Sequence, residues 1–208
     1  MGDNCLCDFQ STKGIVNCEY KNDLEQENKN TEQELRWYAM RATFKREMVA
    51  KQLLDDVEVE NYIPMREVTR IARGRRVTFH EPAIHNLIFV RWTKDALQSF
   101  KRRVPYLQYL TSRCGNDSVP ITVADGDMNS FIALSSSDEL SREYYDPSMA
   151  DIKSGMRVRI TGGTLSGVEG YYVKIKGKRN KRVLVSIDNV VAVATAAVKP
   201  DMIEVIEK

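Results

Sequence analysis

Five glycines fall within sixteen residues toward the C-terminal end of the chain, at positions 162, 163, 167, 170 and 177. Glycine costs a helix interior about 1 kcal/mol relative to alanine, so this density disfavours any stable helix there. The surrounding β-branched and aromatic residues predict short strands at 156–160, 171–176, 183–187, 190–198 and 202–206. Tight strands separated by glycine turns are typical of a small SH3-like β-barrel.

Residues 35–134 show a different pattern, in which helical and strand periods alternate. A buried strand at 36–42 precedes a helix from Phe44 to about Asp55, with Thr43 as its cap and an apolar face of Val49, Ala50, Leu53 and Leu54. Extended structure follows at 62–65, then a hairpin at 67–79, a strand at 86–92, a helix at 94–102, a strand at 106–111 and a helix at 125–134. This order predicts an α+β sandwich.

Charge is segregated along the 208 residues. Residues 1–34 carry 3 basic and 8 acidic side chains without an apolar period, which predicts a disordered acidic leader. Residues 135–152 carry one basic and five acidic side chains. This segment begins with three serines and contains Asp146-Pro147, which favours an irregular acidic linker. The two predicted domains are basic. Residues 35–134 hold 16 basic and 11 acidic side chains, a net charge of +5, and residues 153–208 hold 11 and 5, a net charge of +6. Modest basic charge is compatible with a polyanionic partner or with simple solubility.

Several classes of protein are disfavoured. The longest apolar runs are about half the length that a bilayer requires, and no basic start followed by an apolar block marks a secretory signal, so we expect a cytoplasmic protein. Cys5, Cys7 and Cys18 form no CxxC pair and lie far from both histidines, so we predict reduced thiols, no metal and no cofactor. Without a nucleophile elbow, a phosphate loop or paired acids, we predict no enzymatic activity.

The motifs resemble the NusG family, in which an NGN domain precedes a KOW domain. The Trp37-Tyr38 strand opens the α+β region, Arg103-Val104-Pro105-Tyr106-Leu107 is similar to a Val-Pro segment of NGN domains, and the stretch 155–170 is similar to the KOW signature. The resemblance implies an NGN-type α/β sandwich followed by a small SH3-like KOW β-barrel.

Within the family, Gly74-Arg75-Arg76 and the stretch 81–90, Glu-Pro-Ala-Ile-His-Asn-Leu-Ile-Phe-Val, resemble UpxY-type antiterminators of capsular polysaccharide loci and their relative RfaH. General NusG proteins usually carry Pro-Gly-Tyr where this chain has His85-Asn86-Leu87. The resemblance therefore implies a transcription elongation and antitermination factor of a specific operon. A general NusG, or an RNA- or ribosome-binding KOW protein that does not act on polymerase, is the alternative.

The resemblance implies contacts with RNA polymerase. An apolar set would dock the clamp helices of the largest subunit, and two polar residues would meet the gate loop of the second-largest. These polymerase-binding candidates are Ile84, Leu87, Phe89 and Leu110 for the clamp helices, and Gln98 and Ser99 for the gate loop. Each apolar candidate could equally be an ordinary core residue of a strand.

Basic residues are the candidates for contact with upstream or non-template DNA, through phosphates or a flipped base. They are Arg41, Lys45, Arg46, Arg73, Arg75 and Arg76. For each residue alone, a solvated face is the plainer interpretation. On the predicted barrel, Lys174, Lys176, Lys178 and Arg179 could face nascent RNA, a ribosomal protein or the Rho factor. We expect a monomer that contacts no membrane.

Overall fold

The computed structural model describes residues 34–72, 74–136, 143–145, 155–175, 180–187, 190–194 and 200–207. Its first part is built on a five-stranded antiparallel sheet with β1 (Arg36–Ala42) at the centre. β5 (Leu87–Trp92) pairs with one edge of β1 and also with β2 (Asn61–Tyr62), whereas β6 (Leu107–Tyr109) and β9 (Thr122–Val123) pair with the other edge.

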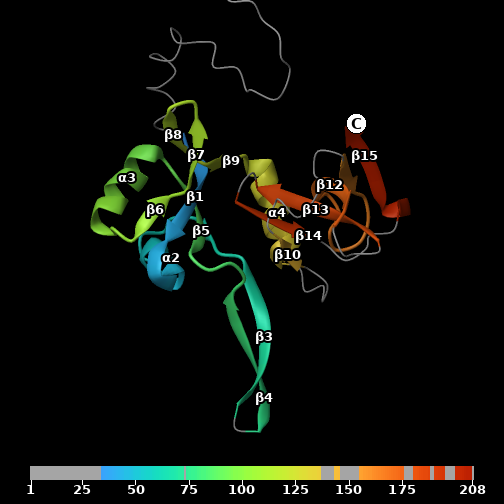
Figure 1. The fold of residues 1–208 in the computed structure, drawn as a ribbon, viewed down its shortest axis with the longest axis horizontal. Coiled ribbons are helices and arrows are strands. Elements are labelled where there is room, and N and C mark those ends of the chain that lie inside the picture. The colour runs from blue at the N-terminus through green and yellow to red at the C-terminus, as the bar shows by residue number, and fades with distance from the viewer. Residues whose placement is uncertain are drawn as a thin grey trace, which may run out of the picture.

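Side chains of β1 alternate between two cores, as a strand buried on both faces requires. Tyr38, Met40 and Ala42 pack in a cluster that includes residues of α2 (Glu47–Asp55) and α3 (Lys94–Arg103). Trp37 and Ala39 belong to a second cluster that includes residues of α4 (Asp125–Ser136). The sheet is therefore covered by α2 and α3 on one face and by α4 on the other (Figure 1).

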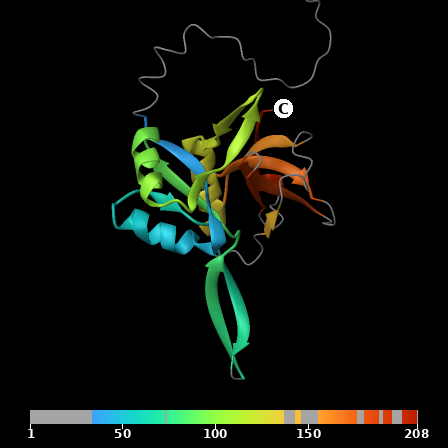
Figure 2. The same cartoon turned by 60° about the vertical axis from the view of Figure 1, so that its left-hand side comes forward.

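Two hairpins extend from this domain. Within the described residues, β3 (Met65–Ala72) and β4 (Arg75–Pro82) form a two-stranded sheet of their own, which projects away from the body as a long arm (Figure 2). β7 (Thr111–Cys114) and β8 (Asp117–Pro120) form a shorter hairpin that the sequence did not predict.

The C-terminal domain is a six-stranded antiparallel sheet in the order β10-β14-β13-β12-β11-β15. Its elements are β10 (Glu143–Tyr145), β11 (Met156–Ile160), β12 (Glu169–Lys174), β13 (Lys181–Ile187), β14 (Val191–Ala194), the 3-10 turn η4 (Pro200–Met202) and β15 (Ile203–Glu207). A Cβ on Gly170 would lie 2.6 Å from the carbonyl oxygen of Leu184, so only glycine fits where β12 meets β13.

Helix α4 joins the two domains. A single core cluster contains Phe89 of β5, Met128 and Phe131 of α4, and Val183 and Val185 of β13. Across the same boundary, the backbone N–H of Glu169 donates to Ser130 Oγ at 3.3 Å. The described parts of the two domains are thus packed together, with α4 between the two sheets (Figure 1).

Three predictions about local structure were wrong in detail. The helix predicted from Phe44 begins at Glu47, because Thr43–Lys45 forms the 3-10 turn η1, in which Phe44 has a φ of 62° and Lys45 one of 55°. On α2, Ala50 and Leu54 are buried, but the predicted core residues Val49 and Leu53 are exposed. The segment predicted to be irregular is helical up to Ser136 and contains strand β10. The leader 1–33 lies outside the described residues.

Candidate functional site

The β3–β4 hairpin carries one group of the predicted basic residues. Arg75 pairs with Ala72, and Arg76 with Ile71, so strand alternation directs the two exposed arginines to opposite faces of the arm. No carboxylate of the described residues lies within ion-pair distance of either guanidinium. Arg73 lies outside the described residues.

Arg66 and Arg70 are not among the predicted nucleic-acid contacts; they lie closer to the body of the domain and share a carboxylate. Each contacts Glu81 at 2.7 Å, and the hydrogen bond from Arg66 is the main cause that holds the pKa of Glu81 below its ordinary value. Among the described residues, Arg66 and Arg70 are thus paired with an acid, whereas Arg75 and Arg76 are not. His80 is an exposed residue of the same hairpin, and its Nε2 lies 3.7 Å from Glu67 Oε1.

The second basic group lies at the end of β1. Arg41, Lys45 and Arg46 are exposed, and they flank Phe44, whose side chain is 82% exposed. The guanidinium of Arg46 lies 5.9 Å from the centre of the Phe44 ring and 5.2 Å from that of Tyr106. The sequence placed Phe44 inside a helix, so its exposure was missed, since no periodic signal marks a residue of a strained turn.

The four apolar residues predicted to contact polymerase differ in how deeply they are buried. Leu87 is 3% exposed and Phe89 is fully buried, with its ring 5.6 Å from that of Phe131 on α4. Ile84 and Leu110 are partly buried and pack against the same cluster. In this conformation only Ile84 and Leu110 are accessible to a partner, because α4 and its cluster cover the other two.

The two polar candidates lie elsewhere. Gln98 and Ser99 are exposed on α3, which covers the opposite face of the sheet from α4. The fold therefore separates them from Ile84 and Leu110 and gives the domain two distinct surfaces.

His85 and Glu47 link α2 to the segment that enters β5. His85 Nδ1 lies 3.3 Å from Glu47 Oε1, and the Glu47 side chain is 2% exposed. This contact ties the segment before β5 to the first turn of α2.

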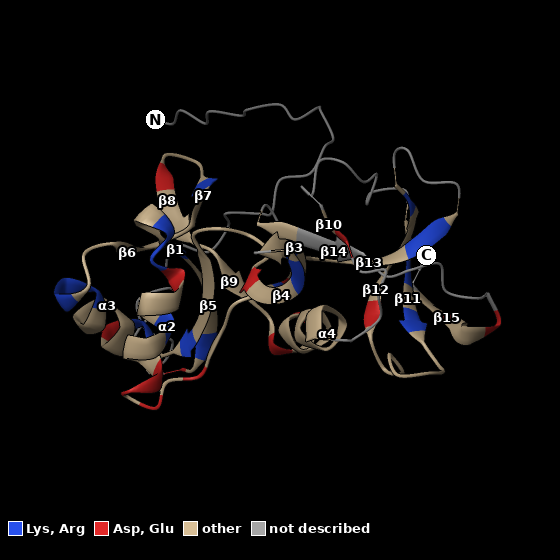
Figure 3. Cartoon of the chain, turned by 90° about the horizontal axis from the view of Figure 1, so that it is seen from below, with Lys and Arg blue, Asp and Glu red and all other residues tan. Residues whose placement is uncertain are grey.

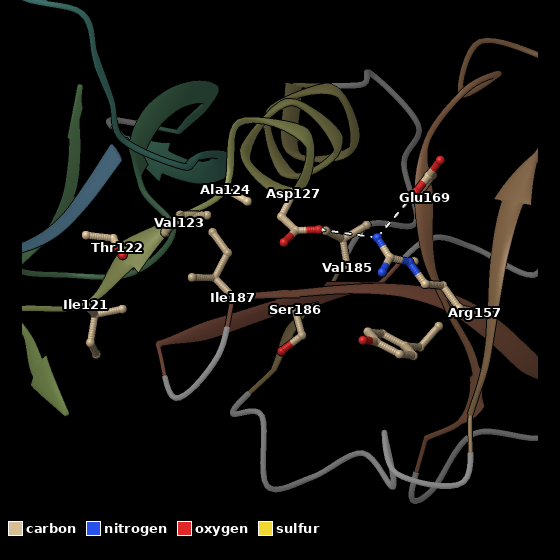
Figure 4. A pocket seen from close by; sticks show the side chains of 12 residues that line it. Ile121, Thr122, Val123, Ala124, Asp127, Arg157, Glu169, Val185, Ser186 and Ile187 are labelled. Carbon is tan, nitrogen blue, oxygen red and sulfur yellow. Dashed lines mark hydrogen bonds and ion pairs between the residues drawn. The ribbon is translucent and has the colours of Figure 1, made fainter. Parts of the chain in front are cut away.

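A small cavity of about 140 Å³ lies between the two domains (Figure 4). It is lined by the segment before α4, by Asp127, and by residues of β11, β12 and β13. Arg157 lies 3.9 Å from Asp127 and 3.4 Å from Glu169, so its charge is already balanced at the cavity wall. The cavity belongs to the domain junction, and nothing in its lining indicates catalytic chemistry.

On the C-terminal sheet, Lys174 is exposed, and its β13 partner Lys181 lies with its Nζ 5.4 Å from the Tyr172 ring centre. Lys176, Lys178 and Arg179 lie outside the described residues. Basic residues occur on α3, the arm and β11 instead of on a single face (Figure 3). No helix in the described ranges is long and apolar enough to cross a membrane.

A sheet covered by helices on both faces, followed by an all-β domain, places the chain in the α+β class. Residues 35–132, just under half of the chain, match the family model described as transcription termination factor nusG. Residues 35–132 are therefore similar to the NusG family, which is a family of transcription factors and not of enzymes.

Among 17 matching chains of solved structures is one described as "Domain interaction in Thermotoga maritima NusG". It is 21% identical to this chain, covers 84% of this chain and 98% of its own, and has a TM-score of 0.42. No curated protein matches the chain.

Proposed function

We propose that this protein is a transcription elongation factor that binds RNA polymerase through its N-terminal domain and suppresses pausing or termination. The observation that carries the proposal is the NusG-family match of residues 35–132, the region that also bears the projecting arm with its unpaired Arg75 and Arg76. A body that rests on polymerase would leave this arm free to reach nucleic acid.

The polymerase contact uses both faces of the domain. Ile84 and Leu110 form the accessible edge of the apolar set and dock the clamp helices, while Leu87 and Phe89 support them from the core. Gln98 and Ser99, on the opposite side of the sheet, meet the gate loop. Contacts on opposite sides suit a factor that bridges the polymerase cleft and favours its forward, closed state by a population shift.

Nucleic acid is contacted by two basic groups. Arg75 and Arg76, together with Arg73 of the same sequence segment, bind phosphates of upstream or non-template DNA, and Arg41, Lys45 and Arg46 form the second contact. Phosphate contacts contribute affinity and steep salt dependence but no sequence readout.

The C-terminal sheet is a KOW-type barrel that recruits a further partner, through Lys174 and the basic residues that follow it. Nascent RNA, a ribosomal protein or Rho are the candidates. The likeness of residues 74–90 to UpxY-type antiterminators supports the further proposal that this factor acts at a specific operon, such as a capsular polysaccharide locus.

The test is a pull-down of purified bacterial core RNA polymerase by the full chain. Wild type is compared with Ile84→Glu and with Val119→Glu, a control at an apolar residue that is 45% exposed on β8. We expect Ile84→Glu to weaken binding at least tenfold and Val119→Glu to leave it unchanged, with folding verified by circular dichroism. If wild type failed to bind polymerase but bound RNA or ribosomes, the proposal would be replaced by the KOW-only alternative.

A further inference from the structure

The turn at residues 43–46, which we name the Phe44 turn, holds an aromatic ring in solvent at the expense of backbone strain. Phe44 has φ 62° and ψ 34°, and Lys45 has a φ of 55°. Residues with a Cβ rarely occupy this left-handed region, and strained residues persist only where the surrounding structure imposes them. Phe44 is also the most exposed large apolar side chain in the described part of the chain, at 82%.

Hydrogen bonds from two other segments impose this conformation. The Lys45 backbone N–H donates to Asn86 Oδ1 at 2.8 Å, and Asn86 is itself left-handed with a φ of 64°. The backbone N–H groups of Ala42 and Thr43 donate to the carbonyl oxygens of Asn86 and Tyr106 at 3.0 and 2.9 Å. The backbone that carries the ring is therefore fixed before any partner arrives, which lowers the entropic cost of binding.

The exposed charged residues nearest to Phe44 in the sequence, Arg41, Lys45 and Arg46, are all positive. Within the described residues, no carboxylate lies within ion-pair distance of Arg41, Lys45 or Arg46. The neighbouring acid, Glu47, is buried and faces His85. The guanidinium of Arg46 lies beside the Phe44 ring and the Tyr106 ring, a flat cationic group next to two aromatic faces.

An exposed aromatic ring among unpaired cations matches the chemistry of an unpaired nucleotide. Bases stack on aromatic side chains and arginine planes with little sequence preference, and adjacent cations neutralise the phosphates. A base inside a duplex presents no free face to such a ring. Duplex DNA could bind here only through contacts between its phosphates and the cationic side chains.

We propose that the Phe44 turn is a stacking platform for an unpaired base of a single-stranded nucleic acid. The Phe44 ring receives the base, and Lys45 and Arg46 contact the flanking phosphates. This inference rests on the proposed function for the source of the strand, the opened DNA or the emerging RNA of a transcribing polymerase, but the binding chemistry itself needs no polymerase.

The test measures fluorescence anisotropy of the full chain with mixed-sequence 12-nucleotide single-stranded DNA, the same sequence as RNA, and the DNA duplex. We expect Phe44→Ala to weaken single-strand binding about 5- to 150-fold, the range for loss of one stacked base. Phe44→Tyr should stay within about twofold of wild type, and duplex binding should change little in either variant. A preference for DNA or RNA identifies the source of the strand.

Val49→Ala is the matched control, because Val49 is 53% exposed on α2 close to the turn. It should bind like wild type. Phe44→Gly separates function from folding: glycine relieves the positive φ, so this variant should melt at a higher temperature than wild type while binding single strands as weakly as Phe44→Ala.

Unchanged single-strand binding by Phe44→Ala would overturn the inference. So would equal losses for single strand and duplex, or a loss of polymerase binding with nucleic-acid binding intact, since that result assigns the ring to a protein partner. If wild type bound no polymerase but bound single strands through Phe44, the inference would stand and the proposed function would fail.

Discussion

At the scale of single residues, burial separates candidates that the sequence treated alike. Leu87 and Phe89 are in the core, Ile84 and Leu110 are at its edge, and Phe44, which the sequence analysis did not select as a contact, is the most exposed of the five. Strand alternation identifies which side chains share a face, but it does not say that α4 covers that face. A substitution therefore reports on binding only where no other element of the fold covers the side chain.

Leu87→Asp illustrates this at the residue scale. A carboxylate at a position that is 3% exposed loses the apolar contacts and is desolvated, so we expect the free energy of unfolding to fall by about 3 kcal/mol or more. Thermal denaturation followed by circular dichroism measures the change. A variant that melts at the wild-type temperature would show that the α4-covered face is open in solution. Loss of binding by Leu87→Asp is thus uninformative unless its folding is intact.

At the scale of elements, the strong periodic signals predicted the strands and helices of the N-terminal domain well. β1, β5, α3 and the β3–β4 hairpin lie where the sequence placed them, within a few residues. The start of α2 was missed because a hydrogen bond from Lys45 to the distant Asn86 imposes the Phe44 turn. Strand β10 was missed because its pairing with β14 is a tertiary contact that three residues cannot signal. Neither contact is local in sequence.

The β3–β4 arm makes a prediction at this scale. No residue from 66 to 83 belongs to either core cluster among the described residues, so replacing 67–80 with a short glycine linker should leave the melting temperature within a few degrees of wild type. The same deletion should weaken binding to DNA and reduce its salt dependence, because each lost phosphate contact lowers the slope of log affinity against log salt by about 0.9. A large drop in melting temperature would show that the arm is part of the fold.

At the scale of the whole molecule, α4 makes the two domains one packed unit. Its apolar residues contact both sheets. In the described part of the chain, the polar links across the junction include the part-buried hydrogen bond from Glu169 to Ser130 and the exposed pair of Arg157 with Asp127. The Arg157–Asp127 pair is 3.9 Å apart with side chains 40% and 55% exposed, and such pairs contribute at most about 1 kcal/mol. The junction is therefore held by apolar burial.

Two substitutions on α4 compare the contributions of apolar packing and of charge to the stability of the junction. Phe131→Ala removes a fully buried ring and should cost about 3–5 kcal/mol of unfolding free energy, while Asp127→Ala should cost less than about 1 kcal/mol. Urea denaturation of both variants gives the comparison. Similar losses for the two would mean that the junction depends on charge instead of on packing.

Binding to an assembled elongation complex with an open bubble is the most direct test of the proposed function. It asks whether this protein acts on transcribing polymerase and reaches nucleic acid with its arm. Native gel shifts compare wild type, the double variant Arg75→Glu/Arg76→Glu, and Arg113→Glu, an exposed arginine on the other hairpin. We predict that wild type and Arg113→Glu bind alike and that the double variant binds about tenfold more weakly at moderate salt. Absence of wild-type binding, or equal binding by the folded double variant, would contradict the account.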